Sequence, residues 1–136
     1  MTSYGLGGLC EHHNDPYGYN EGVPPTEDRR DLQYTGDIMG TVMGWLGETA
    51  AGGETTFFQG PDQVTMRPTR GAAGFWWGVQ TDGSRDQFAV HGGCPVLAGS
   101  KWIVNKWVMT FNQWRRYPCR RQPGGRIQPW PSRHFH

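Results

Sequence analysis

The sequence has no long hydrophobic run and little net charge, and each of these absences excludes a class of protein. No stretch approaches the ~18 consecutive apolar residues of a membrane span, so no spanning segment is predicted. Thirteen Lys and Arg side chains balance twelve Asp and Glu, for a formal charge of +1. This field is too weak to indicate binding to nucleic acid or to an anionic membrane. The opening residues, MTSYGLGGLCEHH, have neither the basic start nor the apolar core of a secretory signal.

Long stretches of helix-forming residues are also scarce, whereas the chain has 21 glycines, 10 prolines and seven tryptophans in 136 residues. This composition favours one all-β domain, a sandwich or barrel of short strands joined by tight turns. We expect strands at 1–15, 38–46, within 47–58, 64–80, 87–93 and 99–111, some helix near 108–116, and a loop at 16–37. The domain is predicted to span residues 1–119. Residues 120–136, rich in Pro, Gly and Arg, are predicted to form a flexible tail.

The cysteine count of three is odd, so one thiol has no partner within the chain. In an oxidising compartment we expect Cys94 to pair with Cys119, leaving Cys10 free. In the cytosol all three would be thiols.

A His-x-Asp unit, His13 and Asp15, is the first candidate for chemistry. Residues two apart on a strand point to the same face, so both side chains could reach one point in space. His91 supplies a second imidazole after a strand-like run. Two histidines and one carboxylate on one face of a metal suit non-haem Fe(II), because the opposite positions stay open for a co-substrate and dioxygen. The alternative for His91 is a histidine at a strand end, bonded to a backbone carbonyl.

Lys101 is the only charged residue between His91 and Asn105, in the run HGGCPVLAGSKWIVN. Burying an ammonium group without a partner is costly, so an anion is expected opposite it. A co-substrate that chelates iron at one end and carries a free carboxylate at the other would supply that anion. The alternatives are a lysine that protects an edge strand from aggregation, and tryptophans that serve as core or as a sugar-stacking platform.

Four segments together resemble the catalytic domain of the prolyl 4-hydroxylases, which are 2-oxoglutarate- and iron-dependent dioxygenases. YGLGGLCEHHND resembles that family's entry to its first two metal ligands, AAGGETTFF its Ala-Gly-Gly-x-Thr-x-Phe-Pro strand, and MRPTRGAAGFWW its Phe-Trp segment. HGGCPVLAGSKWIVNKW, followed by RRYPC, is the most specific match. The resemblance implies a double-stranded β-helix of the jelly-roll or cupin type. It covers only the C-terminal part of the family's domain, so this core is expected to be incomplete on its N-terminal side.

The resemblance also implies roles for particular residues. His13, Asp15 and His91 would ligate Fe(II), and Lys101 would bind the distal carboxylate of 2-oxoglutarate. Tyr4 and Thr55 match positions that hydrogen-bond the same co-substrate, and Trp107 matches a residue that lines its pocket. Cys94 and Cys119 correspond to a disulfide of the collagen-type enzymes.

The implied reaction is hydroxylation of peptidyl proline to 4-hydroxyproline, with release of succinate and CO2 and with L-ascorbate as the reductant that restores the iron. The implied partners are a collagen-like or other prolyl-containing peptide and a protein disulfide isomerase subunit. The implied location is the lumen of the endoplasmic reticulum.

Several positions depart from the family pattern. Cys10 stands where the family has a tyrosine that helps hold the prolyl substrate, His12 and Phe58 stand where it has prolines, and Met109 replaces a histidine. These changes affect the peptide groove and leave the metal ligands intact. They leave two alternatives: a 2-oxoglutarate dioxygenase that acts on a non-collagen protein, or a non-catalytic module that binds Pro-rich peptides by stacking.

Overall fold

The computed structural model describes residues 1–18, 31–120, 125 and 127. Its main elements are antiparallel strands in three sheets. The first has the order β1 (Thr2–Tyr4), β10 (Lys101–Met109), β3 (Ile38–Trp45) and β7 (Ala73–Trp77). The second has the order β2 (Cys10–His13), β8 (His91–Gly93), β5 (Thr55–Phe57) and β6 (Val64–Met66). The third pairs β4 (Thr49–Gly52) with β9 (Val96–Gly99).

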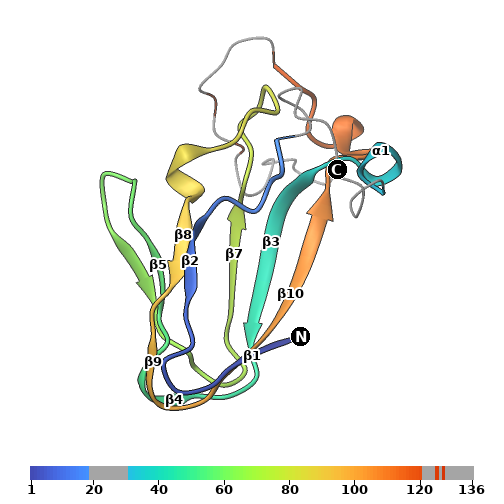
Figure 1. The fold of residues 1–136 in the computed structure, drawn as a ribbon. Helices are drawn as coiled ribbons and strands as arrows, with labels where there is room; N and C mark the ends of the chain where they lie inside the picture. Colours follow the sequence, from blue (N-terminus) through green and yellow to red (C-terminus); the bar gives the residue numbers. More distant parts are fainter. Residues whose placement is uncertain (19–30, 121–124, 126, 128–136) are drawn as a thin grey trace, which may run out of the picture.

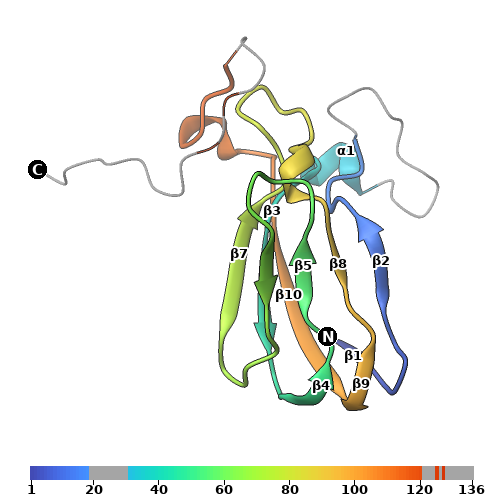
Figure 2. The same cartoon turned by 90° about the vertical axis from the view of Figure 1, so that its left-hand side faces the viewer.

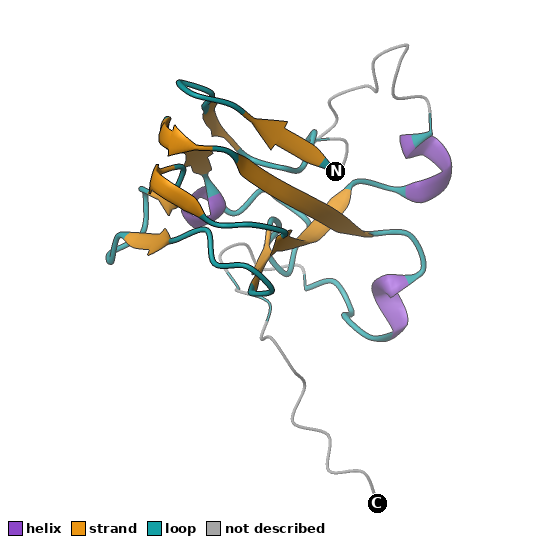
Figure 3. Cartoon of the chain, turned by 90° about the horizontal axis from the view of Figure 1, so that it is seen from below, coloured by secondary structure: helices purple, strands orange, loops and turns teal. Residues whose placement is uncertain are grey.

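The two four-stranded sheets form separate layers, and the β4–β9 pair closes one end (Figures 1 and 2). Helical turns lie around the strands (Figure 3) and comprise α1 (Leu32–Thr35) and the 3-10 turns η3 (Gln87–Ala89) and η4 (Gln113–Arg115). None of the described helices is long and apolar enough to cross a membrane. Because strands in antiparallel sheets make up most of the described elements, the prediction of a mainly all-β fold is confirmed.

The core lies between the layers. On β3 the side chains of Met43 and Trp45 are buried and pack with Ile103 of β10, whereas Val42, which precedes Met43, is 37% exposed. Ile103 pairs with Trp45 and Asn105 with Met43, so the odd-numbered residues of both strands share the inner face. The strand period therefore places Thr41 and Lys101 on the inner face as well.

Four expected elements differ in the structure. Residues 1–15 form two strands in different sheets, because the chain turns between them at Gly7, whose φ of +75° favours glycine. The expected loop at 16–37 contains α1, and its residues 19–30 lie outside the described part. Residues 87–89 are a 3-10 turn instead of a strand, because the Asp86 carboxylate accepts a hydrogen bond from the Phe88 amide. The strand β10 continues to Met109, so helix near 108–116 is limited to η4.

The expected Cys94–Cys119 disulfide is not formed, and all three cysteines are thiols. Cys94 lies between β8 and β9, with its Sγ 3.6 Å from the Oγ1 atom of Thr56. Cys119 is exposed in the segment after β10, which lies at the opposite end of the molecule from β9 (Figures 1 and 2). The two thiols therefore lack the close approach that a disulfide needs. The predicted tail, 120–136, lies almost entirely outside the described residues.

Candidate functional site

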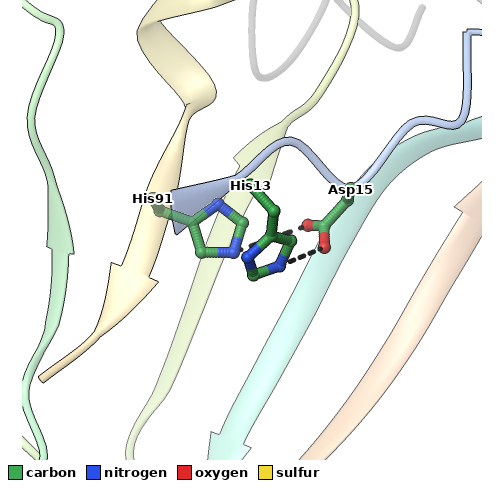
Figure 4. Close-up of side chains that lie close together, drawn as sticks. All are labelled: His13, Asp15 and His91. Atoms are coloured by element: carbon green, nitrogen blue, oxygen red, sulfur yellow. Dashed lines mark ion pairs between the residues drawn. The ribbon is translucent and has the colours of Figure 1, made fainter. Parts of the chain in front are cut away.

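The structure brings together the three side chains of the predicted metal site. One ligand atom from each of His13, Asp15 and His91 lies within 4.8 Å of the others (Figure 4). His13 ends β2 and His91 begins β8, and the two residues are partners in the antiparallel ladder. The Asp15 carboxylate faces both rings, with Oδ1 3.5 Å from Nε2 of His13 and Oδ2 3.9 Å from Nε2 of His91.

The prediction that His13 and Asp15 lie on one strand is wrong. The strand β2 ends at His13, and Asp15 lies in the turn that follows. The buried Asp37 carboxylate holds this turn, because it accepts hydrogen bonds from the amides of Tyr17 and Gly18, each 2.8 Å long. The carboxylate of Asp15 reaches the imidazoles from the turn.

Both imidazoles are oriented by the same kind of hydrogen bond. Nδ1 of His13 lies 2.8 Å from the carbonyl of Glu11, and Nδ1 of His91 lies 2.9 Å from the carbonyl of Ala89. A carbonyl only accepts, so each Nδ1 carries the proton and each neutral ring has its lone pair on Nε2. Metal-binding histidines commonly have this arrangement, in which the second nitrogen donates to a carbonyl. The backbone bond proposed as the alternative for His91 is present, and it leaves Nε2 available.

Asp15 is held by two further donors. Its Oδ2 accepts a 2.7 Å hydrogen bond from the Thr41 hydroxyl and a 3.0 Å bond from Nε1 of Trp76. Burial favours the neutral acid, but the hydrogen bond that His13 donates from Nε2 when protonated and the bond from the Thr41 hydroxyl outweigh it and lower the pKa of Asp15. The carboxylate is therefore ionised at neutral pH.

The two imidazoles are shifted in opposite directions. The hydrogen bond to Asp15 is the main cause that raises the pKa of His13, whereas burial lowers the pKa of His91. His91 is enclosed by aromatic rings, stacked on Phe57 at a centroid distance of 5.1 Å and edge-on to Trp76 at 4.8 Å. Two neutral nitrogens and one carboxylate oxygen form a donor set that fits Fe(II).

Lys101 is buried, with 4% of its surface exposed. Its Nζ donates to Oγ1 of Thr55 at 3.1 Å and lies 5.6 Å from the ring centroid of Tyr4. Burial lowers the pKa of Lys101, although Cys10, Cys94 and Glu54 act in the opposite direction. No carboxylate among the described residues forms an ion pair with this ammonium group. The strand β10 lies between β1 and β3, so the alternative of an edge-strand lysine is wrong.

The four residues expected around 2-oxoglutarate are thus only partly assembled. Tyr4 and Lys101 are ladder partners on β1 and β10, and Thr55 reaches them from the second sheet. Trp107 lies on the same face of β10, opposite Thr41 on β3, and is 42% exposed. Trp107 lies six residues beyond Lys101 along the strand and pairs with Thr41, which contacts Asp15. In register it is therefore closer to the candidate ligand Asp15 than to the ammonium group.

Sequence reasoning missed Thr41, Trp76 and Phe57, which contact the candidate ligands. Thr41 carried a usable signal, because it is the one polar side chain in the apolar run IMGTVMGWL and a buried hydroxyl needs a partner. Trp76 and Phe57 carried none, since aromatic residues in strands usually serve the core.

Comparison with known proteins agrees with this geometry. The family model of the 2OG-Fe(II) oxygenase superfamily matches residues 1–109. The chain is 34% identical over 123 residues to prolyl 4-hydroxylase subunit alpha-3 of Rattus norvegicus, which covers 90% of this chain and 21% of that protein. It is 34% identical over 120 residues to subunit alpha-1 of Homo sapiens, covering 88% and 21%. The chain therefore spans about a fifth of the length of these relatives.

A solved structure shows the same fold. The viral collagen prolyl hydroxylase vCPH of Paramecium Bursaria Chlorella virus-1, in its 2OG complex, superposes with a TM-score of 0.60 at 24% identity. The match covers 79% of this chain and 55% of the viral protein. The predicted double-stranded β-helix is confirmed by this likeness. Fold and family model agree, and the chain belongs to the 2OG-Fe(II) oxygenase superfamily.

Proposed function

We propose that this chain carries the iron and co-substrate site of a dioxygenase that hydroxylates peptidyl proline. The observation that supports it most is the convergence of His13, Asp15 and His91 within 4.8 Å, with both Nε2 atoms directed at the carboxylate. We assign these three residues as the ligands of Fe(II). The overall reaction consumes dioxygen and 2-oxoglutarate with the prolyl peptide, and forms 4-hydroxyproline, succinate and CO2.

The co-substrate is assigned to the region around Lys101. The buried ammonium group supplies a charge for a carboxylate, the Thr55 hydroxyl lies beside it, and the Tyr4 ring lies 5.6 Å from Nζ. Bound iron supplies the oxidising chemistry, while the protein binds and orients the reactants. The inner-face residue Trp107, the ladder partner of Thr41, is assigned to the co-substrate as well, on the metal side of the site.

The substrate and the partners are proposed from what the names of the relatives say of those proteins. The similar proteins are named as prolyl 4-hydroxylase alpha subunits and as a viral collagen prolyl hydroxylase, so a collagen-like peptide is the first substrate to test. Ascorbate as reductant, a disulfide isomerase subunit and the lumen of the endoplasmic reticulum belong to the same proposal.

A second candidate keeps the chemistry and changes the substrate. Cys10, which replaces the family's tyrosine, is half-buried with its Sγ 3.8 Å from Nδ1 of His13. A small thiol at this position leaves room that a tyrosine would fill, which favours a protein substrate other than collagen. Parallel assays with Pro-rich peptides and with other protein substrates separate the two candidates.

The test of the proposed function is substitution of a ligand. His13→Ala and His91→Ala are expected to abolish both Fe(II) binding and formation of succinate from 2-oxoglutarate, because each removes one nitrogen donor. His12→Ala is the matched control, since this exposed neighbour is outside the cluster. Full turnover in His91→Ala would overturn the ligand assignment, and binding of Pro-rich peptide without any iron requirement would favour a non-catalytic module.

A further inference from the structure

We propose that Thr41 and Trp76 are positioning residues that hold Oδ2 of Asp15, so that Oδ1 is the oxygen presented to the metal. This inference rests on the proposed function, because it assumes that Asp15 is a ligand. The Thr41 hydroxyl donates to Oδ2 at 2.7 Å, and Nε1 of Trp76 donates to the same oxygen at 3.0 Å. Among the described residues, Oδ1 has no hydroxyl or indole donor and faces Nε2 of His13 at 3.5 Å, whereas Oδ2 also lies 3.9 Å from Nε2 of His91.

The two donors approach together because the sheet places them side by side. Thr41 on β3 and Trp76 on β7 are direct partners in the antiparallel ladder. Side chains opposite each other in such a ladder point to the same face, about 5 Å apart at Cβ. The carboxylate enters from the turn after β2 and meets both donors at once.

Both donors are themselves held rigidly. Thr41 is fully buried, at 0% exposure, and ends the buried run 38–41 of β3. The indole of Trp76 packs edge-on against His91, with ring centroids 4.8 Å apart, and against Phe57 at 5.3 Å. The same indole therefore orients one ligand by a hydrogen bond and contacts a second by packing.

This arrangement has a chemical consequence. A carboxylate whose second oxygen is occupied by two donors binds a metal through one oxygen, which leaves more positions open for a chelating co-substrate and dioxygen. Without the donors the carboxylate is free to rotate and to offer both oxygens. Loss of such supporting hydrogen bonds typically weakens metal binding by about 10- to 100-fold.

The test uses the full chain and metal ions alone. Mn(II) affinity is measured by the loss of the free-ion EPR signal, and coordination is followed by the visible absorption of Co(II). Thr41→Val, which removes the hydroxyl at constant shape, and Trp76→Phe, which removes the indole donor, are each expected to raise the Mn(II) Kd about 10- to 100-fold. Both variants are also expected to change the intensity of the Co(II) bands, because the number of bound oxygens changes.

Two matched variants distinguish positioning from general damage to the fold. Thr41→Ser keeps the hydroxyl and is expected to recover most of the affinity that Thr41→Val loses. Trp77→Phe removes a similar ring from the opposite face of β7, where Nε1 has no hydrogen-bond partner among the described residues, and is expected to leave the Mn(II) Kd within about threefold.

The outcomes separate this inference from the proposed function. Wild-type affinity and Co(II) spectra in both Thr41→Val and Trp76→Phe, with binding abolished in Asp15→Ala, would overturn the positioning role and leave the metal site intact. Equal losses in Thr41→Val and Thr41→Ser, or in Trp76→Phe and Trp77→Phe, would also overturn it. Wild-type protein that binds neither ion would overturn the metal site and this inference together.

Discussion

Replacement of Lys101 by methionine should separate co-substrate binding from folding, because the two effects have opposite signs. Methionine has a similar length and no charge, so it removes the ammonium group without leaving a large void. The side chain is 4% exposed, and its Nζ makes one hydrogen bond, to Thr55 at 3.1 Å. No carboxylate of the described residues pairs with this charge, so under the proposed function it is available to the carboxylate of a bound co-substrate.

The loss of affinity can be estimated from the burial. Removing one partner of a buried, hydrogen-bonded charge pair costs about 2–5 kcal/mol. Since about 1.4 kcal/mol corresponds to tenfold in affinity, the Kd for 2-oxoglutarate should rise roughly 30- to 4000-fold in Lys101→Met.

The free protein should respond differently. Burial disfavours the charged form of Lys101 and lowers its pKa, so the ammonium group destabilises the ligand-free fold. Methionine removes that cost but leaves the Thr55 hydroxyl without its donor, a loss of about 1 kcal/mol. The free energy of unfolding of the ligand-free variant should therefore equal or exceed that of the wild type.

Calorimetric titration with 2-oxoglutarate in the presence of Mn(II), together with thermal unfolding of the ligand-free protein, measures both effects. Lys106→Met is the matched control, because this lysine lies on the same strand but is exposed on the outer face. The reasoning is refuted if Lys101→Met binds 2-oxoglutarate as tightly as the wild type, or if Lys106→Met weakens it equally. A marked loss of stability in ligand-free Lys101→Met would show that the lysine has a structural anion partner instead.

Two further predictions concern pH and the turn that carries Asp15. The pKa of His13 is raised by its hydrogen bond to Asp15, so protons compete with the metal at a pH where an ordinary imidazole is neutral. Mn(II) affinity should therefore fall steadily from about pH 8 to about pH 6. A constant Kd across this window would contradict the assignment of His13 as a ligand. Asp37→Ala leaves the amides of Tyr17, Gly18 and Ile38 without the carboxylate that accepts their hydrogen bonds. Each donor left without an acceptor costs about 1–3 kcal/mol, so urea unfolding should show a free energy of unfolding lower by at least about 3 kcal/mol. A decrease of less than about 1 kcal/mol would contradict this role of Asp37.

The strands could be predicted where the residue pattern alone determines them. The run 38–46 became β3, at Ile38–Trp45, because eight apolar or small residues with no proline fit a strand buried on its inner face. The 3-10 turn at 87–89 could not be predicted, because it depends on a single capping bond from the Asp86 side chain. The separation of β1 from β2 depends on a glycine turn, and the sequence does not show which sheet each strand joins.

The candidate site was predictable to a similar degree. The residue types of His13, Asp15 and His91 pointed to a metal, and the structure brings their ligand atoms together. The donors that hold them come from β3 and β7, distant in sequence, so their contact with Asp15 is a consequence of strand register and not of any local motif.

The segment from Lys101 to Trp102 shows why burial at a functional site is hard to read from a sequence. Hydrophobicity alone places the tryptophan inside and the lysine outside. The structure reverses this order, with Lys101 4% and Trp102 41% exposed, because β10 must present its odd-numbered residues, Ile103 among them, to the interior. The register in which β10 pairs with β3 decides which of its side chains face the interior, and as a result the charge of Lys101 is buried. Natural sequences violate the burial rule mainly where function requires it, so an inward-facing lysine is stronger evidence for an anion-binding site than the motif that contains it.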